Sequence, residues 1–178
     1  MRVVNGTRNP SIQLYSIFAH PPLLDDGFQT RYDVPQADTS TPPEHRVHTL
    51  SQDFTVHSTL GGITPPTPTS EVRLLRASTH CHAPSCINET LWNLDTNEVI
   101  CYNAPLYGTG KYPSDGQSFN EPAYAAGIPP CFWGDPAEGL PAPPQLRLTT
   151  NLRSVKNCNS THYHFGVMAQ WQMRGTWA

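Results

Sequence analysis

The order of apolar and polar residues along the chain predicts short β-strands rather than helices. Side chains alternate in character over residues 71–82, and shorter runs with β-branched and aromatic residues recur between turn-forming clusters. About eight strands at this spacing favour an all-β fold, an antiparallel β-sandwich of jelly-roll-like form with long Pro-rich loops. The predicted strands cover residues 12–18, 30–34, 46–50, 54–57, 71–82, 87–94, 98–102, 146–153 and 166–173.

Turn chemistry divides the chain into an arm and a body. Residues 1–45 are rich in Pro, Asn, Asp and Gly, and we expect them to form an extended N-terminal arm. Residues 46–178 form the predicted β-sandwich module, in which Asp95-Thr96-Asn97 is typical of a hairpin turn. The body also contains a long loop, residues 103–145, and a loop of that length needs a function or a disulfide to hold it.

Composition strengthens the β prediction and excludes two classes of partner. The 178 residues include 19 prolines and 12 glycines, which disfavour a helical bundle. The 11 Lys and Arg against 14 Asp and Glu give a net charge of −3. We therefore expect neither nucleic-acid binding through phosphate neutralisation nor a basic membrane-binding surface. No apolar run approaches the roughly 20 residues that span a bilayer, so membrane insertion is not expected.

Five cysteines and three glycosylation sequons indicate an oxidising compartment. The sequons begin at Asn5, Asn88 and Asn159, and lysine is scarce. We predict an extracellular or cell-surface glycoprotein with disulfide bonds. The first residues turn polar at once, unlike a signal peptide, so we expect the sequence to be a mature fragment or one module of a longer protein.

The motif His80-Cys81-His82 is the first candidate for chemistry. On a strand the two histidines face the same way, with Cα atoms about 6.6 Å apart, and their imidazoles can converge on one metal ion. Cys81 faces the other way, and in an oxidising compartment it is either paired or a soft ligand nearby. The alternative is a pair of surface or hydrogen-bonded histidines without a metal.

A second motif, His162-Tyr163-His164, repeats the spacing, and Met168 follows four residues later. A straight strand would put His164 and Met168 roughly 13 Å apart, but a bulge at Gly166 would shorten that distance. Imidazole suits copper or zinc, whereas a thioether favours copper, especially Cu(I). Two alternatives stay open: Met168 as a core residue, and a zinc site made of the four histidines of both motifs.

The chain carries a series of further motifs in a distinctive order and spacing. They are RYDVP at 31–35, THCHAPSC at 79–86, VIC at 99–101, PLYGTGK at 105–111, NEPAY at 120–124, PC at 130–131, NST at 159–161 and HFGVM at 164–168. This series resembles the stress-up-regulated nodulin family of plants, over roughly residues 30–173. The match lies in motif order more than in any single motif.

That family is in turn similar to the second domain of the copper monooxygenases that hydroxylate peptidylglycine and dopamine. In those domains an H-x-H strand and a distant Met hold the oxygen-activating copper. The resemblance implies His80, His82 and Met168 as copper ligands, with His164 as a fourth ligand or a group beside them; His162 has no counterpart. Those hydroxylases need a second copper domain that this chain lacks, so the resemblance supports copper binding more than hydroxylation.

The resemblance also implies a disulfide. Cys101 and Cys131 both match cysteines of the nodulin-like pattern, and their bridge would close the long loop, a cross-link worth about 3 kcal/mol in the chain-entropy model. Cys86 with Cys158 is the second predicted bridge. The alternative is five reduced, buried cysteines, which the sequons disfavour.

Three hypotheses for function follow. The first is a secreted, N-glycosylated, copper-binding β-sandwich module, with zinc as the alternative metal. The second is half of a two-copper monooxygenase that needs a missing upstream domain. The third is a structural subunit of an extracellular or cell-surface assembly, a homo-oligomer or filament in which the N-terminal arm pairs with a neighbouring molecule.

Overall fold

The computed structural model describes residues 14–19, 31–110 and 120–178. In those residues the helical structure is limited to three 3-10 turns, Pro43–His45, His57–Thr59 and Pro136–Glu138. The strands are β1 (Leu14–Ala19), β2 (Arg31–Val34), β3 (Val47–Thr55), β4 (Glu71–His80), β5 (Cys86–Asn93), β6 (Glu98–Asn103), β7 (Leu106–Tyr107), β8 (Ala125–Gly127), β9 (Cys131–Phe132), β10 (Gln145–Arg147), β11 (Asn151–Asn159), β12 (His164–Met168) and β13 (Gln170–Trp177). The predicted all-β fold is confirmed.

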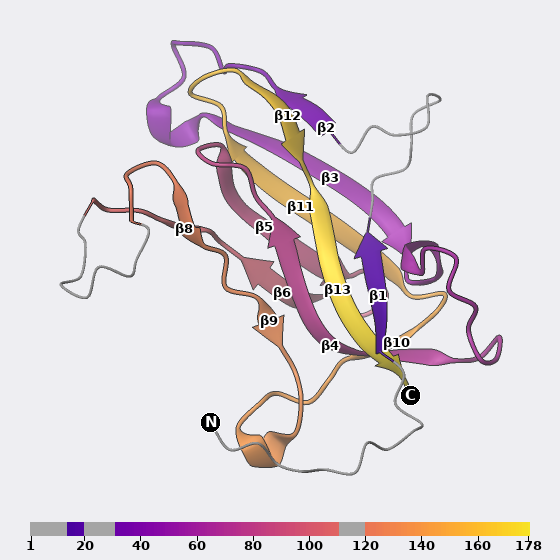
Figure 1. Cartoon of the computed structure of the whole chain (residues 1–178). Coiled ribbons are helices and arrows are strands. Elements are labelled where there is room, and N and C mark those ends of the chain that lie inside the picture. Colours follow the sequence, from indigo (N-terminus) through magenta and orange to yellow (C-terminus); the bar gives the residue numbers. More distant parts are fainter. Residues whose placement is uncertain (1–13, 20–30, 111–119) are drawn as a thin grey trace.

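Two antiparallel sheets form the body. One has the order β1-β13-β4-β10, with β9 also paired to β4, and the other has the order β3-β11-β5-β6. Two small sheets, β12-β2 and β7-β8, lie beside them. Figure 1 shows β12 running directly into β13, so the small β12-β2 sheet continues the line of a strand of the first large sheet.

The larger of two hydrophobic clusters among the described residues draws side chains from both large sheets. Strands β4, β10 and β13 supply one set and strands β5, β6 and β11 supply the other; the main members are Val72, Leu74, Ala77, Leu91, Cys101, Leu146, Leu152, Trp171 and Met173. Trp171, Leu74 and Leu91 are completely buried. Inward residues alternate with outward ones along β11 and β13, which is the period of a strand that buries one face.

Strand boundaries differ from the prediction where turns lack Gly or Pro. The predicted strand 146–153 is two strands, because the Thr150 amide donates to the Arg147 carbonyl and turns the chain between β10 and β11. β11 then continues to Asn159 through polar residues that resemble a loop in sequence. The predicted strand 71–82 ends at His80, so His82 lies beyond it.

The described part of the arm adds strands to this chain's own sheets. β1 pairs with β13 and β2 pairs with β12. The β1 strand therefore has its partner within the same molecule. Residues 1–13 and 20–30 lie outside the described residues, and so does the predicted glycosylation site Asn5. Among the described residues, no helix has the length and apolar character that crossing a membrane requires.

Candidate metal centre

The side chains of His80 and His82 meet where β4 ends. His80 is the last residue of β4, and its register partner is Gln170, the first residue of β13. The chain then turns back: the Cys86 amide and the Ser85 hydroxyl both donate to the His82 carbonyl, each at 3.1 Å. The two Nε2 atoms lie 2.9 Å apart. The turn brings the imidazoles together, rather than the alternation of a continuous strand that the sequence predicts.

The two imidazoles form a hydrogen bond to each other, and their spacing is near that of two ligands of one ion. Two nitrogens bound to one tetrahedral ion at about 2.0–2.1 Å are about 3.3–3.4 Å apart, so an ion would replace the hydrogen bond once the 2.9 Å between these Nε2 atoms widens by about 0.4–0.5 Å. Burial lowers the pKa of His80, and the neighbouring His82 and Lys156 lower it further. The lowered pKa favours the neutral imidazole, which is the form that binds metals.

Met168 ends β12 close to His80. The ammonium of Lys156 donates to the carbonyl of His80 at 2.7 Å and also to the carbonyl of Met168. The register of β12 against β2 shifts between His164 and Val167, and Gly166 in that interval has φ +64°. The bulge predicted at Gly166 is therefore present. It breaks the regular spacing between the second histidine motif and Met168.

The histidines of the second motif, His162 and His164, do not form a metal-binding group with His80 and His82. His164 is half-buried and pairs with Val34 in the small sheet, and His162 is exposed. Across residues 14–19, 31–110 and 120–178, no group of three or more His, Cys, Asp or Glu side chains is placed to hold a metal ion. The four-histidine zinc site is thus not assembled in this structure. The imidazoles of His80 and His82 lie together, and the backbone carbonyls of His80 and Met168 share the ammonium of Lys156.

The cysteines form two disulfides, one of them as predicted. Cys101–Cys131 is present, with Cα atoms 6.0 Å apart. The second predicted bridge, Cys86–Cys158, is wrong: Cys86 is bonded to Cys81, and Cys158 is a buried free thiol. Cys158 is the register partner of Cys86, so proximity does not exclude it. The hydrogen-bonded turn after β4 brings Cys81 back to Cys86 across five residues, and a loop that short costs less entropy to close.

The Cys81–Cys86 bridge has two consequences for the metal centre. Its sulfur atoms are not thiolates, so Cys81 supplies no soft anionic ligand between the histidines. The bridge also closes the turn that contains His82. The backbone at His82 is therefore held by a covalent link around it and by the two hydrogen bonds to its carbonyl.

We expect Cys158 to be the one cysteine that alkylates in unfolded, unreduced protein. Burial raises the pKa of Cys158 to about 11; the charge of Lys156 lowers it and that of Glu89 raises it. The thiolate fraction of the folded protein should therefore rise about tenfold per pH unit up to about pH 11, and native labelling at pH 8 should be far slower than denatured labelling. Peptide mapping after iodoacetamide treatment measures both. A label on Cys101 or Cys131 would contradict the Cys101–Cys131 disulfide, and a label on Cys81 would contradict the Cys81–Cys86 disulfide.

A buried polar network lies beneath the histidines, and sequence reasoning missed it. Lys156 and Glu89 form an ion pair with Nζ and Oε2 3.4 Å apart, and both side chains are 0% exposed. The Thr79 hydroxyl donates to Oε2 of Glu89, and the Ser154 hydroxyl donates to Oε1 at 2.8 Å. The Trp171 indole donates to Ser154 at 3.0 Å. Burial raises the pKa of Glu89, while Lys156 and these hydrogen bonds oppose the rise.

The alternation of buried and exposed positions along β11 is the sequence feature that indicates this network. Lys156 shares its phase on β11 with Leu152, Ser154 and Cys158, all of which are buried. Its register partner is Glu89 on β5. A Lys directly opposite a Glu, both in phase with buried residues, is a cross-strand ion pair turned toward the core.

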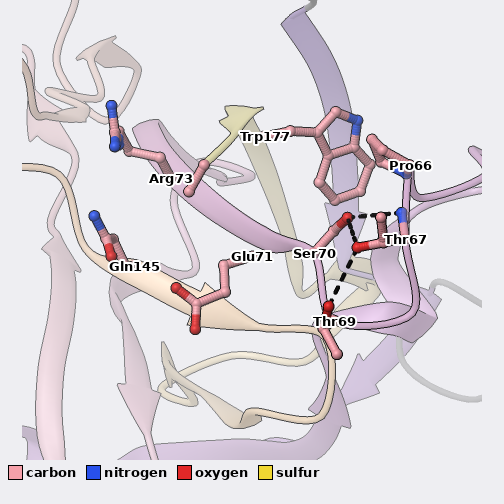
Figure 2. Close-up of a pocket in the computed structure, with 9 residues that line it drawn as sticks. Pro66, Thr67, Thr69, Ser70, Glu71, Arg73, Gln145 and Trp177 are labelled. Carbon is pink, nitrogen blue, oxygen red and sulfur yellow. Dashed lines mark hydrogen bonds between the residues drawn. The ribbon is translucent and has the colours of Figure 1, made fainter.

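An open hollow at the other end of β4 is separate from the metal centre. Figure 2 shows its lining, which is mixed polar and apolar: Pro66, Thr67, Thr69, Ser70, Glu71, Arg73, Gln145, Trp177 and Ala178. The hydroxyls of Thr67 and Ser70 already bond each other at 3.0 Å. Glu71 begins β4 and His80 ends it, so about 30 Å of strand separates the two places.

Comparisons of the chain with family models, with curated proteins and with solved structures gave no match.

Proposed function

We propose that this protein is an extracellular, copper-binding β-sheet module. The observation that carries the proposal is the 2.9 Å approach of the two Nε2 atoms beside the strand end that bears Met168. His80 and His82 would hold the ion through their imidazoles, and Met168 would add its thioether. Bound copper would supply a one-electron redox centre at the surface end of β4.

The donor set favours copper over zinc. Zinc sites in proteins are built from imidazole, thiolate and carboxylate ligands. Here the nearby sulfur atoms of Cys81 and Cys86 are bridged, and no Asp or Glu of the described residues completes a group with the two histidines. Two imidazoles with a thioether suit Cu(I) better than a divalent ion.

Two disulfides support a location outside the reducing cytosol. Of the two described sequons, Asn159 is the better placed for a glycan, because it is exposed at the end of β11. Asn88 is instead half-buried within β5, and its side chain bonds the neighbouring Asn157 of β11, whereas the side-chain oxygen of Asn159 accepts a hydrogen bond from the backbone amide of Thr161. We therefore propose glycosylation first at Asn159.

Copper titration of metal-free protein tests the proposed function. We expect one Cu(I) per chain, and we expect His82→Ala to weaken binding by at least the roughly 100-fold that distinguishes a ligand from its supporting residues. His162→Ala is the matched control, because this exposed histidine is outside the pair and should leave affinity unchanged.

Two outcomes would contradict the site. Unchanged copper affinity in His82→Ala would show that the histidine pair is not the metal centre. If His162→Ala weakens metal binding and Met168→Ala leaves the affinity unchanged, the four-histidine zinc arrangement is favoured instead. A Met168→Ala variant that loses Cu(I) affinity but keeps Cu(II) affinity is the result expected of a thioether ligand.

A further inference from the structure

Lys156 reaches from one large sheet to the ends of two strands outside it. It lies on β11, in the β3-β11-β5-β6 sheet, whereas His80 ends β4 of the other large sheet and Met168 ends β12 of a small sheet. The residue is completely buried, yet its ammonium donates to the backbone carbonyls of both His80 and Met168. One cation thus links the backbones of the two segments that carry the imidazole and thioether donors.

The distances show which partners hold the ammonium most closely. Nζ lies 2.7 Å from the His80 carbonyl and 3.4 Å from the Glu89 carboxylate. The bond to the Met168 carbonyl is also shorter than the contact with Glu89. Hydrogen bonds from a charged donor are short and strong, and a buried carbonyl without a donor costs free energy. Glu89 neutralises the charge, and the carbonyls receive the close bonds.

A carbonyl oxygen is two bonds from the Cα of its own residue, so holding the oxygen limits where that Cα can lie. Holding the two carbonyls on one nitrogen therefore sets the separation between the His80 and Met168 backbones, from which both candidate ligand side chains project. The β4-β13 ladder does not do this for Met168, because the first register pair of β13 is Gln170 with His80 and Met168 precedes it. The Gly166 bulge also loosens the regular pairing of β12.

The geometry points to Lys156 as the positioning residue of the copper site: its ammonium clamps the His80 and Met168 carbonyls so that the thioether meets the histidine pair. This inference rests on the proposed copper function. It assigns a role to a residue that touches no metal, acting through the backbone of the two ligand residues. Supporting residues of this kind typically contribute 10–100-fold to metal affinity.

The test replaces the whole ion pair, so that no charge is left buried alone. In the double variant Lys156→Met/Glu89→Leu, both carbonyls lose the ammonium as a donor while the core keeps a similar volume. We expect Cu(I) affinity to fall about 10–100-fold and Cu(II) affinity to change by less than about threefold. In a Met168→Ala background the same double replacement should have no further effect on Cu(I), because the thioether it positions is gone.

Two controls separate positioning from general destabilisation. Leu91→Ala removes a fully buried core side chain that makes no hydrogen bond to the site, so it destabilises the fold and should leave Cu(I) affinity unchanged. Glu89→Gln removes the counter-charge and so also destabilises the fold, but it keeps Lys156 as the donor to both carbonyls, and it should retain Cu(I) affinity where the double variant loses it. Equal losses in Leu91→Ala and the double variant would overturn the proposal, and so would a loss that persists undiminished in the Met168→Ala background.

A metal-free measurement distinguishes failure of this inference from failure of the copper function. Amide hydrogen exchange at residues 79–81 and 168–171 should be at least about tenfold faster in the double variant than in the wild type, while exchange at the Glu71 end of β4 stays unchanged. If the wild type binds no copper, the copper function and this role fall together, and the exchange result shows whether the clamp exists. If copper binds but exchange and affinity are both unchanged, the positioning role alone is overturned.

Discussion

Lys156→Met alone should lower the free energy of unfolding by about 3–5 kcal/mol. The replacement leaves the Glu89 carboxylate buried without its cation, and breaking a buried ion pair from one side carries that cost. Two backbone carbonyls also lose their charged donor. For a chain of this size the midpoint of thermal unfolding should fall by roughly 10 °C.

The paired variant shows where this cost comes from. Lys156→Met/Glu89→Leu removes both charges, and replacing a buried pair by apolar residues is often neutral or stabilising. We therefore expect most of the lost stability to return in the double variant, as measured by urea unfolding. A double variant as unstable as Lys156→Met would show that the carbonyl bonds, not the orphaned carboxylate, dominate the loss.

Loss of the Cys101–Cys131 disulfide is the second large effect. The bridge closes a loop with a sequence separation of 30 residues, for which the chain-entropy model gives about 3.6 kcal/mol. Cys101 is buried in the core and Cys131 begins β9 beside β4, so the bridge ties the edge of one large sheet to the other. The double variant Cys101→Ala/Cys131→Ala should therefore unfold at clearly lower urea concentration.

Cys158→Ala is the matched control for that measurement. It removes a completely buried sulfur without breaking a bridge, so it should cost only the loss of one small buried group, on the order of 1 kcal/mol. If the two variants lose the same stability, the bridge contributes through packing and not through its constraint on the unfolded chain.

The fold class follows from local pattern. Proline content, turn clusters and the alternation around residues 71–82 predict an all-β chain, and the hairpin between β5 and β6 turns at the predicted Asp95-Thr96-Asn97. These features are local because a strand's two faces and a turn's dihedral angles depend on a few neighbouring residues. The further prediction of a jelly-roll-like sandwich concerns how the strands connect, which local pattern does not determine.

Part of the candidate site could likewise be predicted from local sequence, and part depends on the path of the chain. The spacing of His80 and His82 indicates that the two side chains can converge, and Gly166 indicates a bulge before Met168. The actual convergence depends on a turn after β4 that is closed by the Cys81–Cys86 bridge, where the sequence analysis predicted Cys158 as the partner of Cys86. Any of several cysteines could form a disulfide with Cys86, and the path of the folded chain decides which one does.

What the sequence by itself determined about this protein is its strand content, its hairpin at residues 95–97 and the residue types available for a metal; the Cys101–Cys131 pairing was predicted only through the family resemblance. The tertiary structure alone decided that a Lys on β11 and a Glu on β5 are buried as a pair, and that this Lys bonds the carbonyls of His80 and Met168. The physical reason is sequence distance: Lys156 and His80 are 76 residues apart, and no local preference encodes a contact between two sheets. A buried charge is stable only where the assembled fold supplies all of its partners.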